Sequence, residues 1–157
     1  MKKTFCLALA VILLGLMVTA CGSKQDKVLD TDGFFTQAFE RISYDDELIR
    51  LSDSVIKDFY SLSFEGLEEY RIYVSGTMAT ANELVVFKLK DEKAIESAKE
   101  AVNRRLEDQK ANYQNYNPAQ MQRIENALVH CDSNYLLFSV SNDQNDDVLK
   151  LFNEYLK

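Results

Sequence analysis

The hydrophobic pattern of the first twenty residues differs from that of the rest of the chain. The run 5–18 is almost wholly apolar and follows the basic residues Lys2 and Lys3, and small residues then lead to Cys21. A basic start, an apolar run and small residues before a cleavage site are typical of an export signal. The run is also shorter than the roughly 20 apolar residues of a membrane-spanning helix. We therefore expect residues 1–20 to be a cleaved signal peptide.

Two helices are predicted after a polar stretch. Residues 21–30 have no hydrophobic periodicity, which predicts a flexible tether. Apolar residues recur at helical spacing after Thr31 or Asp32, and again after Ser52 or Asp53, which are suitable capping residues. The two stripes are Phe34, Phe35, Ala38, Phe39 and Ile42 in the first helix, and Val55, Ile56, Phe59 and Tyr60 in the second.

Four strands are predicted in the remainder of the chain. Residues 70–74 alternate between apolar and polar, and residues 84–89 form an apolar, β-branched run. The segments 128–131 and 135–140 repeat this arrangement around a hairpin-type turn. We assign the short segment 48–51 to the helix that follows it.

The longest helix is predicted between Asp91 and Asn117, because the residue before Pro118 resists helical geometry. Pro118 can start a short helix that ends near 127, and a final helix follows Asn142 or Asp143. The long helix has its expected buried stripe at Ile95, Ala98, Val102, Leu106, Gln109, Tyr113 and Tyr116.

A weak internal repeat suggests how these elements combine. Val85, Phe87 and Leu89 match Leu136, Phe138 and Val140, and a helix follows each trio. Any two buried strands can look alike, but two ββα-like units also pair naturally into one sheet. We therefore predict an α+β domain over residues 31–157. It has a four-stranded antiparallel sheet with helices on one face, preceded by the N-terminal helices.

Composition narrows the possible partners. Without residues 1–20 the chain has 137 residues, with 16 basic and 25 acidic side chains, so its formal charge is −9. This acidity argues against nucleic-acid binding and against electrostatic adsorption to anionic lipid. Cys131 is the only cysteine left besides Cys21, so the folded part has no cysteine pair for an internal disulfide.

One polar set interrupts the apolar pattern. Glu83 begins a predicted strand, and Arg105 and Gln109 lie one turn apart on the long helix. Glu83 can form an ion pair with Arg105 that fixes the helix to the sheet. The same residues can instead line a small binding rim with neighbouring side chains. The full candidate rim is Met78, Glu83, Arg105, Gln109, Tyr113 and Tyr116.

The sequence contains no convincing catalytic or metal-binding motif. His130 is the only histidine, so neither a nucleophilic relay nor a zinc site is indicated. Asp143, Asn145 and Asp147 resemble the start of a calcium loop, but Val148 replaces the required glycine. We therefore predict a noncatalytic protein without metal or cofactor.

Two resemblances bear on function. Val18-Thr19-Ala20-Cys21-Gly22 resembles a bacterial lipobox, which implies cleavage before Cys21 and a diacylglycerol on its thiol. The mature chain is similar to an uncharacterised family of small lipoproteins from Gram-positive, clostridia-like bacteria, known only as a domain of unknown function. That similarity rests on the order of 59–61, 67–70, 82–88, 105–110, 116–118 and 134–138. It implies surface anchoring and a small α+β domain, and no activity.

We expect a lipid-anchored lipoprotein on the extracytoplasmic face of the cell membrane. Its expected partners are the membrane, through the lipid on Cys21, and an envelope protein. We expect it to serve as a noncatalytic binding or accessory module of the cell envelope. One alternative is a small substrate-binding component of a transporter. Another is an enzyme acting on envelope polymers, which would need an acid/base pair that includes Glu83. The ligand and the oligomeric state are left open by the sequence.

Overall fold

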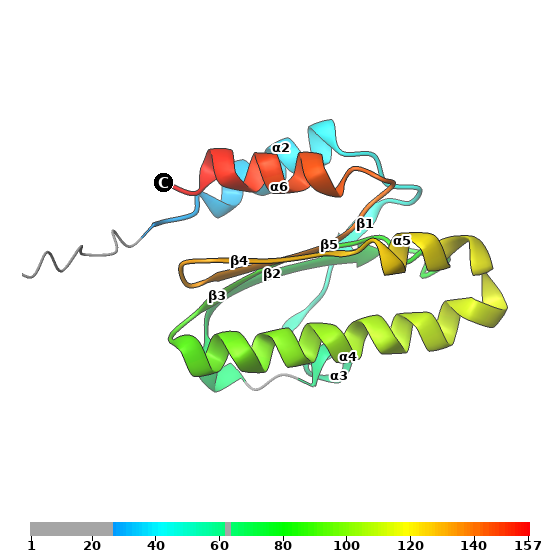
Figure 1. Cartoon of the computed structure of the whole chain (residues 1–157), viewed down its shortest axis with the longest axis horizontal. Helices are drawn as coiled ribbons and strands as arrows, with labels where there is room; N and C mark the ends of the chain where they lie inside the picture. Colours follow the sequence, from blue (N-terminus) through cyan, green and yellow to red (C-terminus); the bar gives the residue numbers. More distant parts are fainter. Residues whose placement is uncertain (1–26, 62–63) are drawn as a thin grey trace, which may run out of the picture.

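The computed structural model describes residues 27–61 and 64–157. They form three layers, in which a β-sheet lies between two helical layers (Figure 1). The expected signal peptide, Cys21 and residues 22–26 of the expected tether lie outside the described residues. In the described part of the chain, no helix is both long enough and apolar enough to cross a membrane.

The helices and strands follow one another in a mixed order. The first half comprises α2 (Thr31–Arg41), β1 (Leu48–Arg50), α3 (Asp53–Tyr60), the 3-10 turn η1 (Phe64–Gly66), β2 (Leu67–Ser75) and β3 (Glu83–Leu89). The second half comprises α4 (Glu92–Tyr116), the 3-10 turn η2 (Pro118–Gln120), α5 (Met121–Glu125), β4 (Leu128–Asp132), β5 (Tyr135–Val140) and α6 (Asn145–Tyr155).

The sheet has five strands in the order β1-β2-β3-β5-β4, and every neighbouring pair is antiparallel. The antiparallel sheet is confirmed, but the expectation of four strands is wrong. Residues 48–50, which we assigned to a helix, pair with β2 through Leu48↔Ser75 and Arg50↔Tyr73. A three-residue strand is too short to show a period in sequence, so only its pairing partner identifies it.

The two strands of the weak repeat meet at the centre of the sheet. Val85 of β3 pairs with Phe138 of β5, and Phe87 pairs with Leu136. Paired residues in an antiparallel ladder point to the same face. Their side chains, together with Ile72 of β2, therefore form one core beneath α3 and α4.

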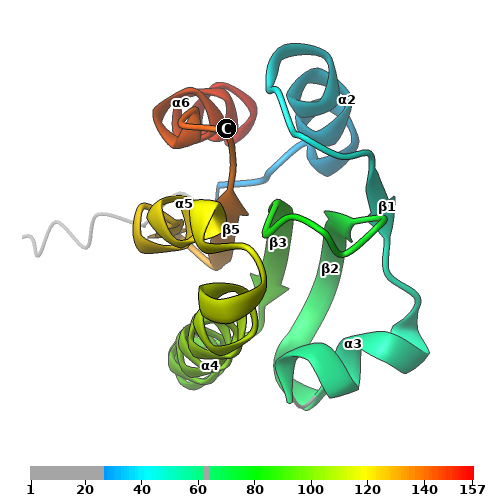
Figure 2. The ribbon, with the colours of Figure 1, turned by 90° about the vertical axis from the view of Figure 1, so that its right-hand side faces the viewer.

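Helices cover both faces of the sheet, so the prediction of helices on one face is wrong. The intervening residues Leu84, Val86 and Leu137 point to the opposite face, where they pack against α2 and α6. Figure 2 shows α2 and α6 on one side of the sheet and α3 and α4 on the other. The physical reason is visible in β5, which is buried at all six positions. A strand buried on both faces has a continuous apolar pattern rather than an alternating one.

The long helix follows the prediction at its ends and differs in its rotation. The carboxylate of Asp91 caps α4 by accepting a hydrogen bond from the Ala94 N–H at 2.8 Å, and the helix ends at Tyr116 with Asn117 as its C-cap. Ala101 and Val102 are fully buried, whereas Tyr116, which we expected in the buried stripe, is 72% exposed. The buried face is thus turned slightly away from Leu106 and Tyr116.

The fold starts before Thr31. Val28 and Lys157 exchange backbone hydrogen bonds of 2.6 and 3.0 Å, and Leu29 forms a β-bridge with Leu156. Lys27 also forms an ion pair of 2.5 Å with Asp132. The last four residues of the expected tether are therefore part of the domain.

These contacts distinguish two ends of the sheet. The turn end comprises residues 27–30, the β4–β5 turn at 132–134 and the C-terminal residues 155–157. The loop end comprises the connections 43–47, 75–82, 117–127 and 141–144. Figure 2 looks directly at the loop end, and Figure 1 shows the chain entering at the opposite end beside the C-terminus.

Consecutive residues of β5 test whether both faces are covered. Leu136→Ala and Leu137→Ala each should lower the free energy of unfolding by about 2–5 kcal/mol, because each leaves a cavity in a different core. Ile49→Ala, at a side chain that is 45% exposed, serves as the surface control. Urea titration measures all three. A loss below about 1 kcal/mol for Leu137→Ala would show that this face is open.

Candidate functional site

A buried carboxylate lies beneath the loop end. Glu83 is the first residue of β3, it points to the same face as Val85, and none of it is exposed. Its Oε2 atom accepts a hydrogen bond of 2.7 Å from Gln109 Nε2. The same oxygen lies 3.1 Å from Nε and 3.0 Å from Nη2 of Arg105. The other oxygen, Oε1, accepts a hydrogen bond from the Tyr60 hydroxyl.

The donors come from two helices that are separate in sequence. Arg105 and Gln109 belong to α4 and Tyr60 is the last residue of α3, so Glu83 joins both helices to the sheet. The guanidinium of Arg105 also lies over the Phe59 ring, 4.6 Å from its centroid. Only 14% of the Arg105 side chain is exposed. Removing any one donor leaves part of a buried charge without its partner.

The environment shifts the pKa values of both ionisable partners of Glu83. Burial lowers the pKa of Arg105, but the charge of Glu83, its hydrogen bonds and the nearby Tyr60 together outweigh burial, so the Arg105 pKa lies above its ordinary value. Burial raises the pKa of Tyr60 well above its ordinary value, and the nearby Glu83 charge raises it further. Tyr60 therefore remains a neutral hydrogen-bond donor throughout the physiological range.

The structure brings three of the six candidate rim residues into direct contact. Glu83, Arg105 and Gln109 form the hydrogen-bonded set, in which both oxygens of the fully buried Glu83 accept hydrogen bonds from protein side chains. The side chains of Met78 and Tyr116 are instead 45% and 72% exposed. This placement favours the structural interpretation of the set, in which the ion pair fixes α4 to β3.

Tyr113 is the link between this set and the loop above it. Its hydroxyl contacts the Met78 and Thr80 carbonyl oxygens, at 3.0 and 2.5 Å. Gln109 Nε2 lies 3.3 Å from the Ala81 carbonyl oxygen. Asn117, the next residue at a spacing of four, donates to the Ala79 carbonyl oxygen at 3.2 Å. One face of α4, together with its C-cap Asn117, therefore holds the backbone carbonyls of residues 78–81 in this loop.

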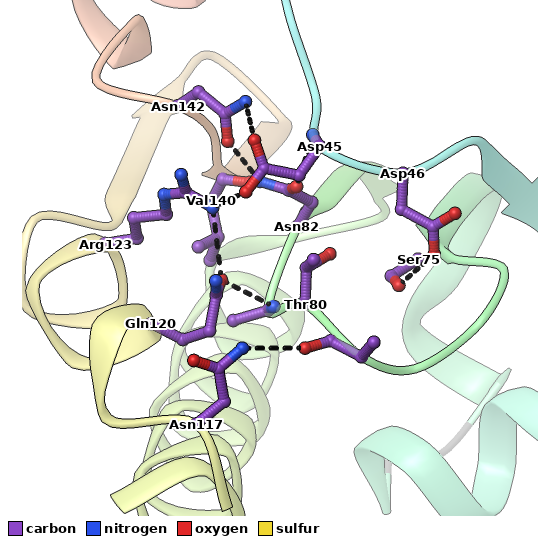
Figure 3. A network of polar contacts seen from close by, with 12 residues as sticks. Asp45, Asp46, Ser75, Thr80, Asn82, Asn117, Gln120, Arg123, Val140 and Asn142 are labelled. Carbon is purple, nitrogen blue, oxygen red and sulfur yellow. Dashed lines mark hydrogen bonds and ion pairs between the residues drawn. The ribbon is translucent and has the colours of Figure 1, made fainter.

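A second network joins this loop to the other connections (Figure 3). The backbone N–H of Asp45 donates to Asn82 Oδ1 at 3.0 Å. The carboxylate of Asp45 accepts a hydrogen bond of 2.7 Å from Asn142 and forms an ion pair with Arg123. Asn82 in turn donates to the Val140 carbonyl oxygen at 3.2 Å. Segments from four parts of the sequence thus meet around Asp45 and Asn82.

Asp46 stabilises the start of the loop 75–82 from outside. Its Oδ2 atom accepts hydrogen bonds from the Ser75 hydroxyl at 2.6 Å and from the Thr77 N–H at 2.8 Å. The Thr77 hydroxyl donates to the same oxygen at 2.6 Å. These donors favour the charged form, and they lower the pKa of Asp46 to about 2. Asp46 therefore keeps its charge and its loop contacts at neutral pH.

The loop end is a polar surface whose backbone is extensively hydrogen bonded. Such an arrangement suits recognition by preformed loops, because little conformational entropy remains to be lost on binding. In the described part of the chain, no three His, Cys, Asp or Glu side chains lie close enough to hold a metal ion. In place of the resembled calcium loop, Asn145 and Asp147 lie in α6.

Sequence reasoning missed several residues of these networks. Tyr60 was expected only as part of an apolar stripe, and Asp45, Asn82, Arg123 and Asn142 were not considered for a site. Arg123 and Asp45 are 78 positions apart in sequence. No local spacing indicates such a contact.

A double-mutant cycle tests the buried set. Arg105→Met leaves the Glu83 charge buried without its counter-ion and should lower the free energy of unfolding by about 3–5 kcal/mol. The double variant Glu83→Gln/Arg105→Met removes that charge and keeps oxygen and amide groups for Tyr60 and Gln109. We expect it to be more stable than Arg105→Met alone in urea titrations. If the stability losses of Glu83→Gln and Arg105→Met add up to the loss of the double variant within about 0.5 kcal/mol, the two residues are not a coupled buried pair.

Comparison of the sequence with known protein families gave a match. The family described as Domain of unknown function (DUF4358) matches residues 42–141, which is more than half of the chain. The match includes the whole sheet with α3, α4 and α5, while α2 and α6 lie outside it. No curated protein and no solved structure gave a match. The chain belongs to the DUF4358 family, whose members share a domain of unknown function.

Proposed function

We propose that this chain is a lipoprotein held by diacylglycerol on Cys21 at the extracytoplasmic face of the cell membrane. There its α+β domain acts as a noncatalytic binding or accessory module of the envelope. The proposal rests on the apolar run, the lipobox-like residues before Cys21 and the acidic mature chain. An acidic domain has no electrostatic attraction to an anionic bilayer, so a covalent anchor supplies the attachment.

The observation that carries the orientation of the anchored domain is where the chain enters it. Lys27 lies at the turn end, where it pairs with Asp132, and Cys21 precedes it by six positions. Six residues span at most about 20 Å. An anchor on Cys21 therefore keeps the turn end close to the bilayer.

The loop end then faces away from the membrane. The strands run from one end of the domain to the other, and β3 alone has seven residues. At about 3.3 Å per residue, the loop end stands roughly 20 Å farther from the anchor than the turn end. The hydrogen-bonded loops around Asp45 and Asn82 are therefore presented to whatever lies beyond the membrane surface.

Two other functions receive less support. A substrate-binding component of a transporter commonly closes two lobes over its ligand, whereas the described residues form one three-layered body. An envelope enzyme would need an accessible acid or base. Glu83, the only residue we considered for that role, is fully buried and hydrogen bonded to Tyr60, Arg105 and Gln109.

Replacing the anchor residue tests attachment. Cys21→Ser should block lipidation, so that the protein moves from the membrane fraction to the medium or accumulates as an uncleaved precursor. Mass spectrometry of the N-terminus in the unmodified chain should show cleavage before Cys21 and an acylated thiol.

Cys131→Ser is the matched control, because Cys131 lies in β4 and takes no part in anchoring. It should leave the protein in the membrane fraction. An intact Met1 or an unmodified Cys21 in the wild-type protein would refute the proposal.

A further inference from the structure

One edge of the sheet is left open. β4 is the last strand in the order β1-β2-β3-β5-β4, and it pairs only with β5. In Figure 1, β4 lies at the front of the sheet, with α6 above it and α4 below. Within residues 27–61 and 64–157, no backbone hydrogen bond joins the outer side of β4 to another segment.

The geometry of the hairpin identifies the backbone groups on this edge. Asp132 and Tyr135 are the pair that closes the two-residue turn, and the register continues regularly to Leu128↔Ser139. In an antiparallel ladder, alternate residues direct their N–H and C=O groups away from the partner strand. Counting from the closing pair, the residues that direct them outward are Val129 and Cys131.

The edge of β4 has one charged residue, Asp132 at the turn end, and otherwise lacks the features that normally prevent strand addition. Proteins protect sheet edges with very short strands, lysine, proline or bulges. β1, at the other edge, has only three residues. β4 has five, Leu-Val-His-Cys-Asp, with neither lysine nor proline and no shift in its register.

The side chains along β4 are suited to an uncharged or apolar neighbour. Val129 is 38% exposed, and Cys131 on the same face is partly buried against the α4 core. Burial raises the pKa of the Cys131 thiol above its ordinary value, so the thiol stays neutral. On the other face, Leu128 packs against the α2–α6 core and the His130 ring lies 6.1 Å from the Phe152 ring.

We propose that the open edge of β4 binds an extended polypeptide segment of another envelope protein as a sixth strand. Backbone groups that point outward at regular intervals recognise another backbone, and the flanking side chains select alternate residues of the added strand. The inference rests on the proposed binding function and names its partner as a polypeptide. Leu128 lies next to the loop end, so a partner that approaches from beyond the membrane can continue along β4.

The anchor argues against a second copy of this chain on the same edge. Antiparallel pairing of two β4 strands would place the turn ends of the two copies at opposite ends of the joined sheet. Each turn end lies within about 20 Å of its own Cys21, which is only six residues before Lys27. With the loop end facing away from the membrane, as proposed above, two copies anchored in one membrane cannot pair in this way.

A library of ten-residue peptides tests the proposal directly. Peptides are selected against the full-length chain in detergent, and their affinities are then measured by fluorescence polarisation. We expect selected peptides to carry apolar side chains at alternate positions. N-methylation of alternate peptide amides should weaken binding about tenfold for each hydrogen bond lost, while methylation of the intervening amides has little effect. Tolerance of N-methylation at every position would overturn the proposal, as would a library that yields no binder.

Matched variants on the two edges locate the site. Val129→Lys should weaken peptide binding at least about tenfold, because it places a charge beside the added strand. Ile49→Lys, at a similarly exposed apolar residue of β1, should leave binding unchanged. Val129→Pro provides a second test. It removes an N–H that points away from β5 and leaves the hydrogen bonds to β5 in place, so it should weaken peptide binding. Equal losses from Val129→Lys and Ile49→Lys would overturn the assignment to β4.

Other occupants of the edge give distinguishable results. Sedimentation of the full-length chain as a dimer that Val129→Lys dissociates would assign the edge to a second copy and overturn the proposal. Peptide binding that appears only after residues 22–26 are replaced by glycine and serine would assign it to the chain's own tether, with the same consequence. The Cys21→Ser protein should bind peptides as the wild type does, because Cys21 is not part of β4. Failure of the anchoring proposal can therefore be distinguished from failure of the proposed peptide site.

Discussion

The carboxylate of Glu83 is buried in the core, and a buried carboxylate is tolerated only when a counter-charge and hydrogen bonds replace its water. Arg105 supplies the counter-charge, and Gln109 and Tyr60 supply the remaining donors. These groups come from α4 and α3, so satisfying the carboxylate fixes the position of both helices on the sheet. Apolar packing alone would allow α4 to slide or rotate, because contacts between aliphatic side chains have little directionality.

The same constraint determines the shape of the loop end. Glu83 directly follows the loop 75–82, and Gln109 contacts both Glu83 and the Ala81 carbonyl oxygen. Once α4 is fixed at Glu83, Tyr113 and Asn117 lie one and two turns beyond Gln109. They donate hydrogen bonds to the Thr80 and Ala79 carbonyl oxygens of the loop. The loop then places Asn82 against Asp45, which connects it to Arg123 and Asn142. A buried ion pair thus organises loops at the surface.

The sequence was sufficient to locate most helices and strands. Asp91 and Pro118 mark the ends of α4 because a capping carboxylate and a proline act locally. Glu83, Arg105 and Gln109 were recognisable because they interrupt apolar patterns, and the structure brings them together.

The other features depend on tertiary contacts that no local pattern contains. β1 exists because β2 offers it a partner, and three residues carry no measurable period. The second helical layer was missed because α2 and α6 are far apart in sequence and pack against each other and the sheet only in the fold. The aromatic ring of Tyr60 led us to assign it to an apolar stripe. Its hydroxyl donates a hydrogen bond to Glu83, which is 23 positions away in sequence. Pairings of this kind are properties of the folded topology.

The proposed orientation of the anchored domain is tested most directly by energy transfer to the membrane. A donor dye is placed on a cysteine at Ser133, in the turn end, or at Met78, in the loop end, in a Cys131→Ser background. The acylated protein is reconstituted in vesicles that carry acceptor dyes in their headgroups. Transfer from Ser133 should exceed transfer from Met78, because the loop end stands about 20 Å farther from the anchor. Equal transfer from the two positions, or stronger transfer from Met78, would contradict a loop end that faces away from the membrane.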